Sequence, residues 1–182
     1  MQENSVHIGT SGWSYKHWKG RFYPDDLPVS RWLQYYAGHF HTVEVNNTFY
    51  RWSSDAAFTS WRGRLPDSFL MTIKAPRPLT HYKRLSEPKE WIERIGHSVS
   101  LLREKLGIFL VQLSSDFPAN HERLAAFLEL LPRLIRTAVE FRHPSWNTEA
   151  TFALLEHYGA AYCVTSGGFT ARLSMPSNLG SE

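Results

Sequence analysis

The stretch His41-Thr-Val-Glu-Val-Asn-Asn-Thr-Phe-Tyr50 decides how the rest of the chain is read. It begins as a strand, because Val43 and Val45 alternate with polar residues as they would in a strand with one buried face. Glu44 lies at the centre of that strand, and a buried carboxylate without a partner is strongly destabilising. We therefore expect this strand to deliver polar side chains to a site.

Short apolar strands alternate with helical patterns along the whole chain. Strands are predicted at Val6–Thr10, Thr42–Asn46, Phe69–Lys74, Ile108–Leu113, Thr137–Arg142 and Ala160–Thr165. Helices are predicted at Ser30–Gly38, Ser54–Arg62, Pro88–Leu106 and Asn120–Leu131, and from Asn147 or Thr148 to Gly159. No hairpin signal separates the strands, so the pattern predicts a parallel sheet flanked by helices.

Two finer predictions concern the segment around the third strand and the helix that follows it. The segment Ala75–Arg84 contains two prolines and is therefore predicted to contain no helix. In the helix Pro88–Leu106, the spacing of Trp91, Ile95 and Val99 predicts a stripe of buried residues.

Two architectures fit alternating strands and helices. A doubly wound sheet is one, but the glycine-rich phosphate loop that often follows its first strand is missing. The other is an α/β barrel of the TIM, or (β/α)8, type, in which the site lies at the carboxyl ends of the strands. The barrel is favoured because the strands carry polar residues near those ends.

Composition sets outer bounds on the class of protein. The 182 residues are 42% hydrophobic, enough for one domain with a sizeable core. A net charge of +3 permits an anionic ligand, although an ordinary surface balance is the favoured explanation. Cys163 is the single cysteine, so no intrachain disulfide can form. No signal peptide and no membrane-spanning apolar run are recognised, so a cytoplasmic location without membrane contact is expected.

Polar residues near the ends of four strands occupy alternate positions and so share one face of the predicted sheet. Residues two apart in a strand lie on the same face, and the polar face carries Glu44, Asn46, Thr72, Lys74, Gln112, Glu140 and Arg142. We expect Lys74 and Arg142 to hold an anion. Glu44 and Glu140 are the candidate catalytic residues, acting in proton transfer or binding hydroxyls or a metal. The alternative is an internal network that merely satisfies buried polar groups.

Aromatic residues in the loops after the strands are expected to wall the barrel mouth. The candidates are Trp13, Tyr15, Trp18, Tyr50 and Trp146. Aromatic faces stack on bases or sugars. The alternative is that these rings form a packed cap over the barrel.

Metal binding and nucleophilic catalysis are less well supported. His81 and His143 could join Glu44 and Glu140 around one divalent ion, but no His-x-x-x-His spacing occurs. A hydrogen-bonding role for each histidine is favoured. Cys163 has no assigned base, and no motif for an organic cofactor is recognised.

Several ordered motifs resemble a known family. They are Gly9-Thr-Ser-Gly-Trp-Ser-Tyr-Lys-His-Trp-Lys-Gly-Arg-Phe-Tyr-Pro24, Thr42-Val-Glu-Val-Asn-Asn-Thr-Phe-Tyr50, Lys74-Ala-Pro-Arg-Pro-Leu-Thr-His81 and Val139-Glu-Phe-Arg-His-Pro-Ser-Trp146. Together they resemble the YecE-like family, domain of unknown function 72. The resemblance implies a TIM barrel and adds no established activity. Its remote similarity to xylose-isomerase-like and AP-endonuclease barrels makes a phosphate or nucleic-acid ligand an analogy only.

The chain departs from the family pattern at three places. Ser114-Ser115 stand where the family usually has two prolines, and the segment Cys163–Gly168 lacks the acid that usually ends strand 6. The motifs of the last two family strands are absent. We therefore expect residues 1–182 to form one incomplete barrel of about six βα units, with an irregular tail at 169–182. Exposed edges of the first and last strands would then permit self-association.

Three functions from different classes follow. The leading hypothesis is a protein that binds a small phosphate-bearing anion through Lys74 and Arg142. Asn46, Asn47 and His143 would orient the ligand, and Gln112 is a further ligand-binding candidate. The second is a metal-dependent phosphodiesterase or nuclease. The third is a non-enzymatic module that binds nucleic acid or another partner through its aromatic loops. The sequence does not decide whether the protein is an enzyme.

Overall fold

A computed structural model describes residues 6–166 as one six-stranded sheet with helices. The strands are β1 (Gly9–Ser11), β2 (Thr42–Val45), β3 (Leu70–Lys74), β4 (Leu106–Gln112), β5 (Thr137–Glu140) and β6 (Ala161–Tyr162). They follow one another in chain order, and every neighbouring pair is parallel. The predicted parallel βα repeat is confirmed.

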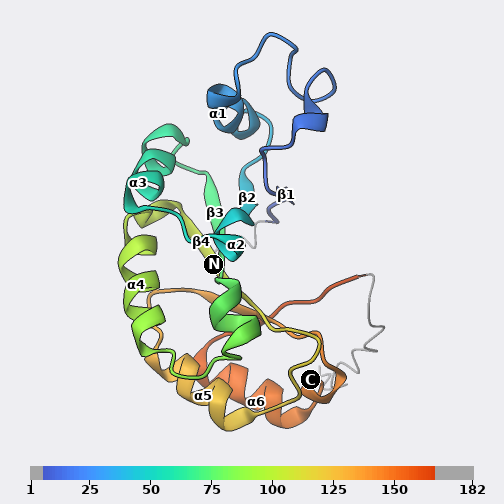
Figure 1. Cartoon of the computed structure of the whole chain (residues 1–182), viewed down its shortest axis with the longest axis vertical. Helices are drawn as coiled ribbons and strands as arrows, with labels where there is room; N and C mark the ends of the chain where they lie inside the picture. The colour runs from blue at the N-terminus through green and yellow to red at the C-terminus, as the bar shows by residue number, and fades with distance from the viewer. Residues whose placement is uncertain (1–5, 167–182) are drawn as a thin grey trace, which may run out of the picture.

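Helices connect the strands, as parallel pairing requires. They are α1 (Trp32–Ala37), α2 (Asn47–Tyr50), α3 (Asp55–Arg64), α4 (Lys89–Ser100), α5 (His121–Leu130) and α6 (Glu149–Tyr158). The shorter turns are η1 (Lys16–Trp18), η2 (Val29–Arg31), η3 (Pro78–Tyr82), η4 (Arg103–Lys105) and η5 (Pro144–Trp146). Figure 1 shows α3, α4, α5 and α6 following one another in an arc along one side of the molecule.

Side chains at the helix ends explain several of these boundaries. Ser54, Asn120 and Thr148 each accept a hydrogen bond from a backbone N–H of the first turn of the helix that they precede. Gly159 ends α6 in the left-handed conformation, with φ of 65°, which glycine adopts without strain. None of the helices described between residues 6 and 166 has the length and apolar character that a bilayer crossing requires.

The two faces of the sheet differ in the way the sequence predicts. Val43, Val45, Met71, Ile73 and Val139 are at most 1% exposed and belong to the main hydrophobic core. The polar residues that alternate with them project from the opposite face, which would be the inside of a barrel. Across residues 6–166, β1 and β6 do not pair with each other, so the structure is an incomplete TIM-type barrel.

A cluster of aromatic rings packs beside the first two strands. The rings of Tyr23 and Trp32 stack with centroids 4.5 Å apart, and the Tyr36 hydroxyl contacts both the backbone N–H and the side chain of Thr10 at 2.9 Å. Burial is the main cause of a raised pKa at Tyr23. This cluster fixes the long loop after β1 against α1.

Three predicted segments differ from the structure. The Ala75–Arg84 segment was expected to lack helix, yet Pro78–Tyr82 forms a π-helical turn; Pro78 starts it, where a missing N–H does no harm. The helix predicted to reach Leu106 ends at Ser100, because Arg103 takes a positive φ of 49° and Leu106 enters β4. The first strand begins at Gly9 rather than Val6, whose side chain is 88% exposed.

Two smaller differences concern α4 and α2. Trp91 was predicted to belong to the buried stripe of α4 but is only half-buried. Ile92 is buried there instead, beside Ile95 and Val99. The four-residue helix α2 was not predicted, since it is too short to show a helical period. The irregular tail predicted at 169–182 lies outside the described residues.

Candidate functional site

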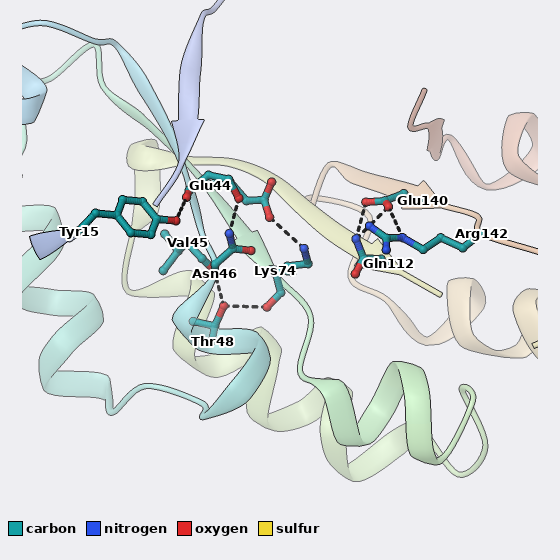
Figure 2. A network of polar contacts seen from close by, with 10 residues as sticks. Tyr15, Glu44, Val45, Asn46, Thr48, Lys74, Gln112, Glu140 and Arg142 are labelled. Atoms are coloured by element: carbon teal, nitrogen blue, oxygen red, sulfur yellow. Dashed lines mark hydrogen bonds and ion pairs between the residues drawn. The ribbon is translucent and has the colours of Figure 1, made fainter. Parts of the chain in front are cut away.

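The ends of β2 and β3 carry an ion pair. Glu44 lies opposite Thr72 in the parallel register, and Lys74 comes two residues later on the same face. The Lys74 Nζ atom lies 3.1 Å from Oε1 of Glu44, and the two side chains are 12% and 24% exposed. Figure 2 shows this pair at the mouth of the open sheet. The pair is therefore partly shielded from water, which weakens screening by salt.

A second polar cluster lies at the ends of β4 and β5. Gln112 and Glu140 are register partners, and Nε2 of Gln112 lies 2.8 Å from both carboxylate oxygens. Nε of Arg142 donates to Oε1 of Glu140 at 2.8 Å. The Glu140 side chain is only 6% exposed, whereas that of Arg142 is 53% exposed. Glu140 is thus a buried acceptor that orients two donors at the mouth (Figure 2).

Helix α2 is tied to both neighbouring strands. The Thr48 hydroxyl, fully buried, lies 2.7 Å from the carbonyl oxygen of Val45 and 2.8 Å from that of Lys74. The Asn46 side-chain amide donates to the Ser11 hydroxyl, and the Tyr15 hydroxyl donates to the Ser11 carbonyl. These contacts fix α2 and the loop after β1 relative to the strand ends.

A cavity of about 720 Å³ opens at these strand ends. We call it the strand-end cavity. Eight of the residues predicted to bind a ligand line it: Trp13, Tyr15, Asn46, Asn47, Tyr50, Lys74, Gln112 and Arg142. Glu44 and Glu140 are not among its lining residues. The lining of the cavity therefore includes the two cations and the amides, whereas the two carboxylates lie outside it.

Charged residues of the mouth shift the pKa values of two nearby groups, His81 and Cys163. Burial lowers the pKa of His81, and Arg77 and Arg142 lower it further. Burial likewise raises the pKa of Cys163, and Glu140 and Glu44 raise it further. Glu44 and Cys163 also line one smaller hollow on the inner face of the sheet. Arg142 thus acts on His81, whereas Glu140 and Glu44 act on Cys163 against an opposing effect of Lys74.

Three predicted mouth residues lie elsewhere. Trp146 was expected to wall the mouth, but it is fully buried and its indole N–H donates to the Phe117 carbonyl at 2.8 Å. Trp18 packs against Phe22 in the aromatic cluster and does not line the strand-end cavity. His143 lies outside the cavity lining as well, because its Nδ1 accepts the Ser145 backbone N–H and caps η5.

Phe49 is a cavity residue that sequence reasoning missed. Its ring lies 5.4 Å from Nζ of Lys74 and 5.0 Å from the ring of His81. Phe49 follows the polar residues after β2 and directly precedes Tyr50, which was predicted to wall the mouth. This adjacency was the signal that could have identified it. A cation over an aromatic face is favourable, and Phe49 therefore helps to hold Lys74 at the cavity.

The four residues considered as metal ligands are not gathered into one site. Glu44 contacts Lys74, Glu140 contacts Arg142, and His81 contacts the Thr80 hydroxyl at 2.9 Å through Nδ1. Within residues 6–166, no group of three or more His, Cys, Asp and Glu side chains is placed to hold an ion.

Comparison with known proteins relates this chain to others of similar sequence. The family described as protein of unknown function DUF72 matches residues 7–179. UPF0759 protein YecE of Escherichia coli K12 is 29% identical over 142 residues, which are 78% of this chain and 50% of that protein. UPF0759 protein YunF of Bacillus subtilis 168 is 28% identical and covers 96% of this chain and 65% of its own length. The chain thus spans about half to two thirds of these relatives.

Two solved structures share the fold. A DUF72 family protein from Thermotoga maritima aligns with a TM-score of 0.75 and 34% identity, covering 86% of this chain and 63% of that one. A DUF72 family protein from Enterococcus faecalis V583 aligns with a TM-score of 0.60 and 22% identity, covering 73% of this chain and 58% of that one. The first supports the fold and the relationship, and the second supports the fold alone.

Proposed function

The chain belongs to the family of proteins of unknown function DUF72, and from that premise we propose that its strand-end cavity binds a small anion carrying a phosphate group. The observation that carries the proposal is the lining of the cavity: Lys74, Gln112 and Arg142 face it, and Glu44 and Glu140 do not. A cavity with convergent cations and amides suits an anion with several acceptor oxygens.

The cations keep donors available after pairing with the carboxylates. Arg142 uses Nε for Glu140, so its two Nη groups make no hydrogen bond within the described part of the chain. Lys74 has three N–H donors and gives one to Glu44. The remaining edge of the planar guanidinium, formed by the two Nη groups, fits phosphate in a bidentate manner, and an ammonium adds a point charge.

The two candidate catalytic carboxylates suit different roles in this proposal. Glu140 is buried and accepts from Gln112 and Arg142, so it serves to hold those donors toward the ligand. Glu44 has one partner, Lys74, and is 24% exposed, so of the two it is better suited to accept a proton. Asn46 and Asn47 line the cavity and would orient ligand hydroxyls.

Binding of ribose 5-phosphate, measured by isothermal titration calorimetry, tests the proposal. Each charge-assisted contact contributes enough that removing one cation weakens binding about tenfold, and Lys74→Ala with Arg142→Ala about a hundredfold. The matched control is Arg133→Ala with Arg136→Ala, because this pair removes the same charge from exposed positions just before β5, at the opposite end of the strands. Equal affinity of the double variant and the native chain would refute the proposal.

Loss of folding must be separated from loss of binding. Lys74→Ala leaves Glu44 without its partner, so a second variant, Lys74→Met with Glu44→Gln, removes both charges of the pair together. It is expected to fold as the native chain does and to bind ribose 5-phosphate about tenfold more weakly. Unchanged binding by this folded variant would count equally against the proposal.

A further inference from the structure

A second cavity, of about 670 Å³, lies beside the strand-end cavity. The two share Asn47, Phe49 and Tyr50 as lining residues, all three on α2. Helix α2 therefore forms the partition between them, and Tyr50, 75% exposed, lies on that partition. A molecule longer than one cavity would pass over α2 from one to the other. We call the second space the α2–α4 cavity, because Trp91 and Arg94 of α4 also line it.

The α2–α4 cavity combines aromatic rings with arginines. Trp52 and Trp91 line it together with the two aromatic residues of α2. Arg51 and Arg94 supply positive charge, both being exposed, and no Asp or Glu is among the lining residues. Trp91 and Arg94 are three residues apart on α4 and so lie on the same helix face. This combination suits a flat ring that is linked to an anionic group.

The Trp52 ring is held in place before any ligand arrives. Its indole N–H donates to the Ser98 hydroxyl at 3.1 Å, and that hydroxyl donates to Oδ1 of Asp55 at 2.9 Å. Its ring also packs against Phe58, with centroids 5.5 Å apart. A half-buried ring fixed at its polar edge loses little conformational entropy when another ring stacks on it. The cavity wall is thus preorganised.

We infer that the α2–α4 cavity is a base-binding subsite and that the ligand is a nucleotide or a short single-stranded oligonucleotide. Its base lies against Trp52 and Trp91, Arg94 contacts a flanking phosphate, and a phosphate next to that base lies in the strand-end cavity. The inference rests on the proposed function and names the chemical class of its ligand.

The test compares ribose 5-phosphate with adenosine 5′-monophosphate on the full chain. Native protein should bind the nucleotide about tenfold more tightly, since a base stacked on an aromatic ring adds roughly that factor. Trp91→Ala should remove the difference without weakening ribose 5-phosphate binding, and Trp91→Phe should keep most of it. The control is Tyr158→Ala, a half-buried aromatic residue of α6 that lines neither cavity.

The outcomes separate the two proposals. Equal affinity of the native chain for both probes, or a nucleotide preference that survives Trp91→Ala, would overturn the subsite and leave the proposed function standing. Nucleotide binding that depends on Trp91 but not on Lys74 and Arg142 would support the base subsite and refute the phosphate site. Binding of neither probe would refute both.

A trinucleotide such as thymidylyl-thymidylyl-thymidine should bind more tightly than the mononucleotide and lose affinity with Arg94→Ala but not Arg133→Ala.

Discussion

The ion pair Glu44–Lys74 and the cluster Glu140–Gln112–Arg142 use similar residues at strand ends of one sheet, yet their burial is reversed. In the first the acid is the more exposed partner, at 24% against 12% for the lysine. In the second the acid is 6% exposed and the arginine 53%. A buried carboxylate depends on its donors, whereas an exposed one can be hydrated. The stability of the second cluster should therefore depend more strongly on its acid than the stability of the first does.

Removing the buried acid should have the largest effect on stability. Glu140→Ala leaves Gln112 and the Nε of Arg142 without their acceptor. Losing a buried hydrogen-bonded partner costs about 1–3 kcal/mol per unsatisfied group, and we expect about 2 kcal/mol because the half-exposed Arg142 regains water. Urea unfolding of native and variant chains measures this difference. A loss below about 0.5 kcal/mol would mean that Glu140 does not anchor the cluster.

Removing the charge of the acid in the first pair should have a milder effect on stability. Glu44→Gln keeps the shape of the side chain and removes its charge, and Lys74 can turn to the cavity water and the Phe49 ring. We expect a loss of about 0.5–1 kcal/mol, near the value of a partly exposed ion pair. The same urea unfolding experiment measures it. If Glu44→Gln costs as much as Glu140→Ala, the contrast between the clusters is wrong.

The smallest effect concerns the protonation of His81. Arg142 and, to a lesser extent, Lys74 lower its pKa in addition to burial and Arg77. Arg142→Ala should therefore raise the His81 pKa more than Lys74→Met does, and a phosphate-bearing ligand in the strand-end cavity should raise it as well. NMR titration of the imidazole measures all three shifts. A larger rise with Lys74→Met would contradict the stronger effect of Arg142 on the His81 pKa.

The lowered His81 pKa also predicts how stability depends on pH. The unfolded chain binds a proton at His81 at higher pH than the folded chain does. This contribution to stability is fully present above the ordinary histidine pKa of about 6.5 and is lost as pH falls from there through the folded value. In His81→Gln, urea unfolding between pH 7.5 and pH 5 should show a smaller decline. An equal decline would mean that other groups cause it.

The sequence predicted the fold because its signals are local and repeated. Alternation of Val43 and Val45 with Glu44, and of Met71 and Ile73 with Lys74, identifies the buried face of each strand without any knowledge of its neighbours. Parallel pairing is implied by the helices between the strands. The helix α2 escaped prediction because four residues show no period, and the π-helical turn at Pro78 because the prolines of that segment argue against helix.

The candidate site was predicted only in part, since its arrangement depends on contacts between distant segments. Which strand ends carry polar residues is visible in the sequence. That Glu140 would be buried and bonded to Gln112 and Arg142 is not, because this arrangement depends on the register between β4 and β5. Trp146 shows the same limit, because a tryptophan in a loop can face a cavity or the core. In the structure it faces the core, where the distant Phe117 carbonyl accepts its indole N–H. The cytoplasmic location and self-association stay predictions.

The proposed anion site requires that Lys74 and Arg142 face the strand-end cavity while Glu44 and Glu140 lie outside its lining. A crystal structure of the full chain with ribose 5-phosphate tests this arrangement most directly. We expect phosphate oxygens within hydrogen-bond distance of Nζ of Lys74 and the Nη atoms of Arg142, with Glu140 still holding Gln112. Phosphate bound elsewhere, or a cavity in which Glu44 and Glu140 replace the cations at the ligand, would contradict it.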